Sequence, residues 1–313
     1  MKRQNVILFV MTIILVSTIS LLSAGAPESG DWTMRRSDEA GKVQFSLMQS
    51  SKGHNSQHSS AWALTAFQGL DSSTAARHDV HFTVTRDAGK FDCVGFLREG
   101  EGAGVFHFTP DARFPQEMEG LGFRGIDGEK QYEMAVLDVS VGFAREMAGE
   151  HLRGMDTDKL IEFRIFNVDS KFIHALRDAG LPANDSARLV EFRIHGVTPE
   201  MARYLRQQGY APDEEKLVEM RIHGATPEFI DALAKAGYQH VELDKLIEFR
   251  IHAVTPEFIE KLHGLGYVHP DPDKLVEMRI HGVTPEFIAS MQAKGLKNLS
   301  VDHLVEMRIH GIE

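Results

Sequence analysis

The sequence predicts an α+β protein in which a small antiparallel β domain precedes a solenoid of paired helices. The first observation is a phrase that recurs six times, at steps of 29, 28, 29, 29 and 29 residues. Its copies begin at Arg164, Arg193, Arg221, Arg250, Arg279 and Arg308. A fixed step of this size is typical of solenoids, in which each unit packs on its neighbours. The second observation is an apolar/polar alternation upstream of the repeats, which is typical of half-buried strands.

The second half of each repeat predicts a helix. Threonine, proline and glutamate stand in succession at its start: Thr198, Thr226, Thr255 and Thr284 open these phrases. The threonine oxygen accepts a free backbone N–H, proline sets φ, and the acid meets the positive end of the helix. A glycine follows each helix, as left-handed residues beyond a helix C-terminus do. These glycines are Gly180, Gly209, Gly237, Gly266 and Gly295.

The first half of each repeat leaves two folds open. Val218, Met220 and Ile222 alternate with polar residues, which fits a strand and hence a leucine-rich-repeat-like β/α horseshoe. Capping residues favour a second helix instead, and therefore αα-hairpins. The N-cap positions hold Asp156, Asp213, Asp271 and Ser300, and the C-terminal positions hold Gly196, Gly224, Gly282 and Gly311, with Asn167 and Ala253 as variants. In the helical fold Arg221 falls within the apolar arc, so it has to pair or extend to solvent.

Upstream of the repeats, residues 42–108 are predicted to form a small sheet of about four strands, preceded by a linker at 27–41. Val43, Phe45 and Leu47 show the strand alternation, and residues 87–90 and 100–104 carry hairpin-turn signals. A Ser/His-rich segment, residues 49–60, is expected to be a loop between strands. The tandem repeats are expected to occupy residues 109–313.

Residues 1–26 are predicted to be an export signal peptide or an N-terminal anchor. Lys2 and Arg3 precede an apolar run at residues 6–22, and small residues follow it. The protein is therefore expected to be periplasmic, secreted or anchored at the cytoplasmic membrane, touching the membrane only through this segment if it is uncleaved. A formal net charge of -11 disfavours nucleic acid as a partner. The single cysteine, Cys93, is expected to be a buried apolar residue.

Three columns of the repeat phrase form a candidate partner-binding face. Its residues are Glu219, Arg221, His223, Glu248, Arg250, His252, Glu277, Arg279 and His281. The glutamates and arginines form either a ladder of weak surface ion pairs or a repeated comb for a charged partner. Equivalent histidines of neighbouring repeats are expected to lie too far apart to converge on one metal ion. Each histidine is expected instead to interact with the last carbonyls of a helix. A pH-responsive role for them stays open.

No catalytic residue, metal site or cofactor is predicted. The chain lacks His-Glu-x-x-His and Gly-x-Ser-x-Gly, and the glycines of residues 100–104 join two strands, unlike a phosphate loop. An enzyme that uses the Ser/His-rich segment, with His54 and His58, and the β domain is an alternative. Tyr210, Tyr238 and Tyr267 are expected to hold one repeat to the next.

The phrase Arg-Ile-His-Gly-Val-Thr-Pro-Glu-Phe-Ile, intact at residues 279–288, resembles repeats of bacterial envelope proteins that follow the peptidase of BlaR1-type (M56 family) antibiotic sensors. Residues 86–91 and 102–110 resemble the small domain before those repeats. This chain lacks the multi-span bundle and the zinc motif, so the resemblance implies a sensing or docking module without peptidase activity. We expect a non-catalytic exported scaffold that binds a protein or envelope component, or alternatively an accessory module of a membrane signalling protease system.

Overall fold

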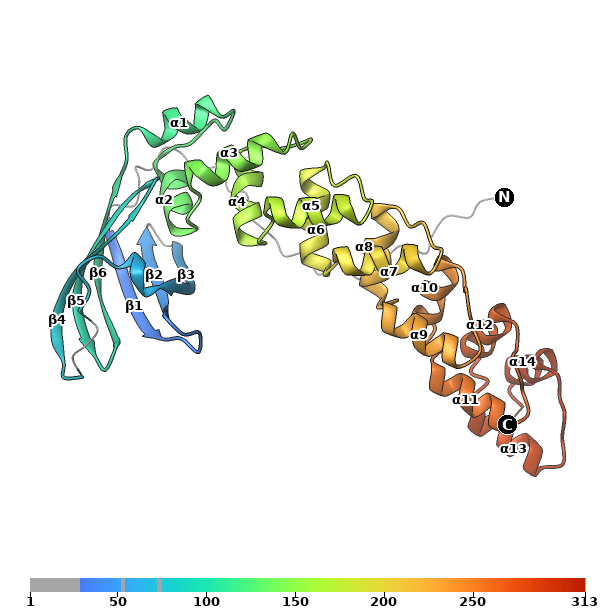
Figure 1. Ribbon diagram of the computed structural model, residues 1–313. Coiled ribbons are helices and arrows are strands. Elements are labelled where there is room, and N and C mark those ends of the chain that lie inside the picture. The colour runs from blue at the N-terminus through green and yellow to red at the C-terminus, as the bar shows by residue number, and fades with distance from the viewer. Residues whose placement is uncertain (1–28, 52–53, 72–74, 313) are drawn as a thin grey trace. The chain divides into compact units, whose positions relative to one another are not determined.

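The computed structural model describes residues 29–51, 54–71 and 75–312 (Figure 1). The predicted leader, residues 1–26, lies outside these residues. The chain divides into two compact units. The first holds the described residues up to Thr85, together with Gly89–Pro110 and Asp127–Glu133. The second holds Arg86–Ala88, Asp111–Ile126 and the residues from Met134 onward.

Six strands of the first unit form one antiparallel sheet, in the order β3-β2-β1-β6-β5-β4. They are β1 (Ser29–Arg36), β2 (Lys42–Ser51), β3 (His54–Ala63), β4 (His78–Arg86), β5 (Gly89–Arg98) and β6 (Glu101–Pro110), with a short 3-10 turn, η1 (Leu64–Ala66), after β3. Two predictions are wrong here. The segment predicted as a linker supplies β1, and the Ser/His-rich segment predicted as a loop lies in β2 and β3, which pair as a regular hairpin.

Aromatic side chains fill the inner face of this sheet. Phe45 of β2 and Phe82 of β4 have ring centroids 6.2 Å apart, although three strands lie between β2 and β4. The sheet therefore curls around its own core. Trp32 of β1 lies 6.0 Å from Phe45 and 5.1 Å from Phe82, and Phe67 lies 5.6 Å from Phe82. The predicted burial of Val43, Phe45 and Leu47 in β2 is confirmed.

Glycines in β5 and β6 make room for Trp32. A Cβ on Gly95 or Gly104 would lie 2.6 or 2.8 Å from its indole ring, while the indole Nε1 donates to the carbonyl of Val94 at 3.1 Å. Gly104 belongs to the segment predicted as a turn. The β5–β6 turn itself consists of Glu99 and Gly100, whose φ angles of 54° and 79° suit a two-residue type I′ hairpin.

Fourteen α-helices follow in the described part of the chain (Figure 1). The helices that end in the Arg-Ile phrase, here called the A helices, are α4 (Thr157–Ile165), α6 (Ser186–His195), α8 (Glu214–His223), α10 (Leu243–Ile251), α12 (Pro272–Ile280) and α14 (Val301–Ile309). The B helices alternate with them: α3 (Val141–Gly149), α5 (Ser170–Asp178), α7 (Pro199–Gln207), α9 (Pro227–Lys235), α11 (Pro256–Gly264) and α13 (Pro285–Ala293). Before them stand α1 (Phe114–Gly120) and α2 (Gly128–Val136).

A helices pack on A helices, as α6, α8 and α10 do, and B helices pack on B helices, as α5, α7 and α9 do. The second unit is therefore a two-layer helical solenoid, and the α+β class with αα-hairpin repeats is confirmed. The horseshoe alternative is wrong. Val218 and Met220, whose alternation fitted a strand, are buried in α8 together with Leu217, because successive turns of a helix bring these positions to one face.

The helix ends form as predicted. Thr198, Thr226, Thr255 and Thr284 accept the backbone N–H three residues later, at 3.2, 3.4, 3.2 and 3.2 Å. Asp156, Asp213, Asp271 and Ser300 are side-chain N-caps of A helices. The glycines after the B helices have positive φ, between 86° and 95°. These contacts are local, so neighbouring residues in the sequence suffice to specify them.

Candidate functional site

The arginines of the candidate face lie across the boundaries between repeats. Each donates from Nε to a backbone carbonyl at the end of the preceding A helix. The pairs are Arg221 with His195 (3.1 Å), Arg250 with His223 (3.4 Å) and Arg279 with His252 (3.1 Å). Carbonyls at a helix C-terminus lack intrahelical partners and attract cations. The arginine thereby supplies a hydrogen-bond donor to a carbonyl at the end of the preceding A helix. Arg221 is accommodated beside the apolar arc because its side chain makes this pair.

Five arginines of this column have guanidinium groups that lie over rings of the preceding B helix. The pairs are Arg164 over Phe143 (5.0 Å), Arg193 over Phe172 (3.7 Å), Arg250 over Phe229 (4.9 Å), Arg279 over Phe258 (5.0 Å) and Arg308 over Phe287 (5.1 Å). In the repeat before Arg221, the equivalent position holds Met201. Cation–π contacts of this kind contribute about 0.5–1 kcal/mol at exposed sites. Arg250 and Arg279 make both contacts and thus join their repeats to both layers of the preceding repeat.

The glycines that end A helices leave space for these arginines. A Cβ on Gly196 would lie 2.9 Å from Nη2 of Arg221, and a Cβ on Gly224 would lie 3.1 Å from Nη2 of Arg250. Both glycines also have positive φ, 70° and 74°. Ala253 occupies the same position with a φ of 54°, a conformation that costs an L-residue about 1–2 kcal/mol. The position favours glycine both for its backbone and for the room that the next arginine needs.

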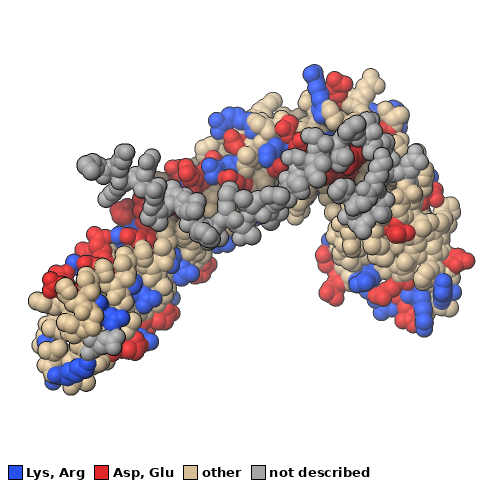
Figure 2. Space-filling view, turned by 180° about the vertical axis from the view of Figure 1, so that it is seen from behind, with Lys and Arg blue, Asp and Glu red and all other residues tan. Residues whose placement is uncertain are grey.

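The glutamates of the candidate face belong to a ladder of ion pairs. Each lysine of the ladder contacts the glutamate three residues later and an aspartate of the next repeat. The contacts are Lys216 with Glu219 (2.5 Å) and Asp244 (2.6 Å), Lys245 with Glu248 and with Asp273 (2.5 Å), and Lys274 with Glu277 (2.7 Å) and Asp302 (2.5 Å). Hydrogen bonds to Asp244 and Glu219 raise the pKa of Lys216. Acidic and basic side chains are accordingly interspersed along the repeats (Figure 2).

The histidines of the candidate face stand at the ends of A helices. His223 is the last residue of α8, and His252 and His281 are the C-caps of α10 and α12. At His223 and His252 the backbone carbonyl makes the contact to the next repeat. Among the residues that the structure describes, no group of three or more His, Cys, Asp or Glu side chains could hold a metal ion.

Three tyrosines join the loops of successive repeats, as predicted. Their hydroxyl groups donate to backbone carbonyls of the next repeat: Tyr210 to Val241 (2.9 Å), Tyr238 to Pro270 (2.7 Å) and Tyr267 to Leu299 (2.8 Å). Burial, with the charge of Asp271 nearby, raises the pKa of Tyr238 to about 12. The hydroxyl is therefore a neutral donor across the whole physiological range of pH.

A row of exposed isoleucines, one per A helix, is the surface feature that the sequence analysis missed. We call Ile165, Ile194, Ile222, Ile251, Ile280 and Ile309 the isoleucine row; their exposed fractions lie between 49% and 57%. Ile222 stands about 140° around the helix from the buried Leu217, which takes it out of the apolar arc. A helical wheel of the A helix carries this signal, whereas counting Ile222 in a strand alternation hides it.

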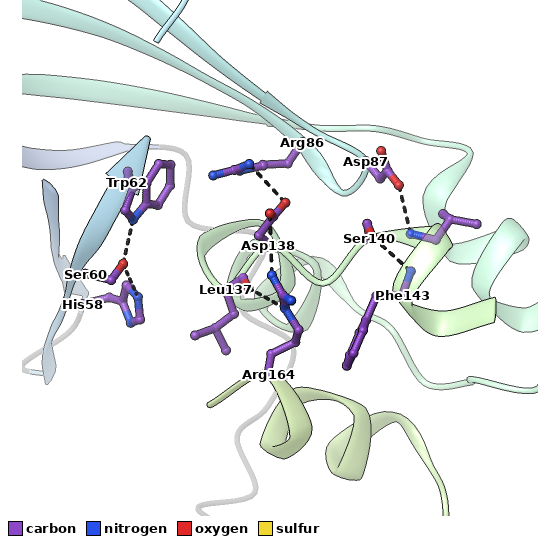
Figure 3. A network of polar contacts seen from close by, with 11 residues as sticks. His58, Ser60, Trp62, Arg86, Asp87, Leu137, Asp138, Ser140, Phe143 and Arg164 are labelled. Atoms are coloured by element: carbon purple, nitrogen blue, oxygen red, sulfur yellow. Dashed lines mark hydrogen bonds and ion pairs between the residues drawn. The ribbon is translucent and has the colours of Figure 1, made fainter. Parts of the chain in front are cut away.

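Polar side chains of the Ser/His-rich segment hydrogen-bond one another along β3. His58 Nε2 hydrogen-bonds the Ser60 hydroxyl at 3.2 Å, and the same oxygen accepts from Trp62 Nε1 at 2.6 Å (Figure 3). Burial lowers the pKa of His58. The Ser60 hydroxyl is therefore held by neighbours on its own strand. The side chain of His54 lies outside the described part of the chain.

A second polar network lies at the start of the helical unit, before and around α3. Asp138 contacts Arg86 at 3.1 Å and Arg164 at 3.6 Å, and Asp87 accepts the backbone N–H of Val141 at 2.9 Å (Figure 3). Val141 is the first residue of α3, so Asp87 satisfies a free N–H and places negative charge at the positive end of that helix. These groups are paired for stability at the start of the repeats.

Fold and surface together define an α+β protein whose helical repeats present a regular outer face. No protein-family model, curated protein or solved structure matches the chain. In the described residues, no helix is both long and apolar enough to cross a membrane. The function is therefore argued from the surface of the repeats themselves.

Proposed function

We propose that this protein is a non-catalytic binding scaffold that engages a protein or cell-envelope partner through the outer face of its A helices. The isoleucine row carries the proposal. Six large aliphatic side chains, each about half exposed, recur at one position of a regular array. Single exposed apolar residues are normal, but apolar surface organised in this way is typical of interaction sites.

The stability of the repeats does not require isoleucine at this position. Leu217, Val218 and Met220 bury the core face of α8, while Ile222 stays 56% exposed. The identity of the residue is nevertheless the same in all six A helices. Removing apolar surface from water contributes about 25 cal/mol per Å². The isoleucine row gains this free energy only when a partner covers it.

Two further parts of the proposal rest on sequence. The basic and apolar leader supports export, and cell fractionation with an antibody to the mature chain tests it. The likeness of residues 279–288 to repeats of BlaR1-type sensors supports a narrower role as an accessory module of a signalling protease system. A gene for such a protease beside the gene for this chain would favour that role.

The central test compares capture of partners from envelope extracts by three forms of the full chain. The first is the unmodified protein, and the second carries Ile222→Ser, Ile251→Ser and Ile280→Ser. The third carries Val268→Ser, a matched control because Val268 is 69% exposed and lies outside the row. We expect the unmodified and control forms to capture the same partner and the triple variant to lose it, with equal far-ultraviolet circular dichroism. Equal capture by all three forms would rule out the isoleucine row.

A further inference from the structure

A carboxylate accompanies the isoleucine on nearly every A helix. It stands seven residues before the isoleucine, which is close to two helical turns, so both side chains lie on one face about 10.5 Å apart along the axis. The pairs are Asp158 with Ile165, Glu215 with Ile222, Asp244 with Ile251, Asp273 with Ile280 and Asp302 with Ile309, whereas Ala187 stands at this position before Ile194. The side chains of Asp244, Asp273 and Asp302 are 84%, 79% and 69% exposed. A row of carboxylates therefore runs beside the isoleucine row.

The lysines neutralise only part of this charge. Lys216, Lys245 and Lys274 each contact two carboxylates, so three cations face six anions: Glu219, Asp244, Glu248, Asp273, Glu277 and Asp302. Arg221, Arg250 and Arg279 add three cations at the other end of the A helices. The acids of the N-caps and first turns still outnumber the bases: α8, α10, α12 and α14 with their N-cap residues hold twelve Asp and Glu against seven Lys and Arg. The A helices that carry the isoleucine row therefore have an acidic excess.

Resting on the proposed scaffold role, we propose that the isoleucine row binds a basic segment of a protein partner whose apolar side chains are spaced to meet successive isoleucines. Charge complementarity selects the partner. A second copy of the chain would bring the same acidic excess against itself, and an anionic lipid surface would be repelled in the same way. A Lys/Arg-rich segment is attracted, and its apolar residues cover the isoleucines.

The period of the solenoid sets the spacing of those apolar residues. Neighbouring helices in a packed layer lie about 8–10 Å apart. A polyproline II segment returns to the same side every three residues, or about 9 Å, and an α-helix does so every seven residues, or about 10.5 Å. Apolar residues at a period of three or seven, separated by Lys or Arg, therefore match the row.

The test uses the full chain and a displayed library of random 20-residue peptides. Selected peptides are expected to carry a net positive charge, with apolar residues at a period of three or seven. Their affinity is expected to fall at least tenfold between 50 mM and 300 mM salt, because screening weakens charge attraction. The Ile222→Ser, Ile251→Ser, Ile280→Ser variant is expected to lose at least tenfold in affinity, and Val268→Ser less than twofold.

Selection of neutral or acidic peptides, affinity that does not change with salt, or an empty selection would overturn the proposal. None of these results would refute the scaffold role, because the capture experiment with envelope extracts decides that separately. Equal peptide binding by the triple isoleucine variant would overturn the location of the site.

As a test of charge, Asp244→Asn with Asp273→Asn is expected to weaken binding of a selected basic peptide about tenfold. An unchanged affinity in that variant would contradict the part given to the carboxylate row.

Discussion

Replacing Arg279 by methionine tests whether the repeated arginine holds the solenoid together or serves as a charged contact for a partner. In the structure, Nε of Arg279 donates to the carbonyl of His252 at 3.1 Å, and its guanidinium lies 5.0 Å from the centre of the Phe258 ring. Arg279→Met removes both contacts and keeps an apolar stem of similar length. The substitution also leaves the carbonyl at the end of α10 without this donor.

The expected loss of stability follows from those two contacts. A hydrogen bond from a charged group contributes about 1.5–3 kcal/mol, and an exposed cation–π contact about 0.5–1 kcal/mol. Because methionine retains part of the packing, we expect the free energy of unfolding to fall by about 2–3 kcal/mol. For a unit of this size such a loss lowers Tm by roughly 4–12 °C.

Arg203 of α7 supplies the matched control. It is an exposed arginine whose Nη1 lies 3.2 Å from Glu200 of the same helix, a type of pair that contributes little to stability. We expect Arg203→Met to change the free energy of unfolding by less than about 0.5 kcal/mol. Urea unfolding followed by circular dichroism gives both values, and hydrogen exchange locates the loss at α10 and α12.

The reasoning is refuted if Arg279→Met is no more destabilising than Arg203→Met. If the same variant then also lost binding of a partner, the arginine column would be a ligand comb after all. Arg279→Lys separates charge from shape. A lysine keeps the cation but has no guanidinium fork, so we expect it to recover less than half of the lost stability.

Three other predictions follow from single positions. Ala253→Gly relieves a positive φ of 54° and is expected to raise the free energy of unfolding in urea by about 0.5–1 kcal/mol. Met201→Phe supplies the missing ring for Arg221, with an expected gain of about 0.5–1 kcal/mol that Arg221→Met abolishes in a double-mutant cycle. Burial raises the pKa of the Cys93 thiol from 9.0 to about 12; we expect no labelling at pH 8 until the chain unfolds, and a stability contribution that holds below pH 9 and declines toward pH 12.

Local chemistry made the helix boundaries predictable. Thr226 caps α9 through a backbone N–H three residues away, and Gly237 follows the helix with positive φ, so a short window of sequence contains every group involved. The strand β1 was not predictable in this way. Its Trp32 and Met34 pair with residues of β2 and β6, and the partner in β6 is separated from them by about 70 residues of chain. The hairpin of β2 and β3 was missed for a related reason. Backbone pairing holds it together, and polar residues form such pairs as well as apolar ones do.

The contacts of the candidate binding face could likewise be known only from the three-dimensional structure. Glu219, Arg221 and His223 recur with period 29 or 28 and were visible as columns, but their spacing says nothing of which side chains turn back onto the preceding repeat. Only packing between repeats places the Arg221 guanidinium against the carbonyl of His195. The same packing leaves Ile222 at the surface, although its apolar side chain alone would assign it to the core.

By itself, the sequence determined the α+β class, the repeat length, the capped ends of the helices and the tyrosine contacts between repeats, because periodicity and short-range hydrogen bonds specify them. The tertiary structure decided the choice of helix over strand in each first half-repeat, the curl of the sheet, and which residues of the repeat phrase contact the preceding repeat and which stay exposed. Those features arise from contacts between segments that the chain brings together only on folding, where burial and pairing of one repeat depend on the atoms that its neighbour presents.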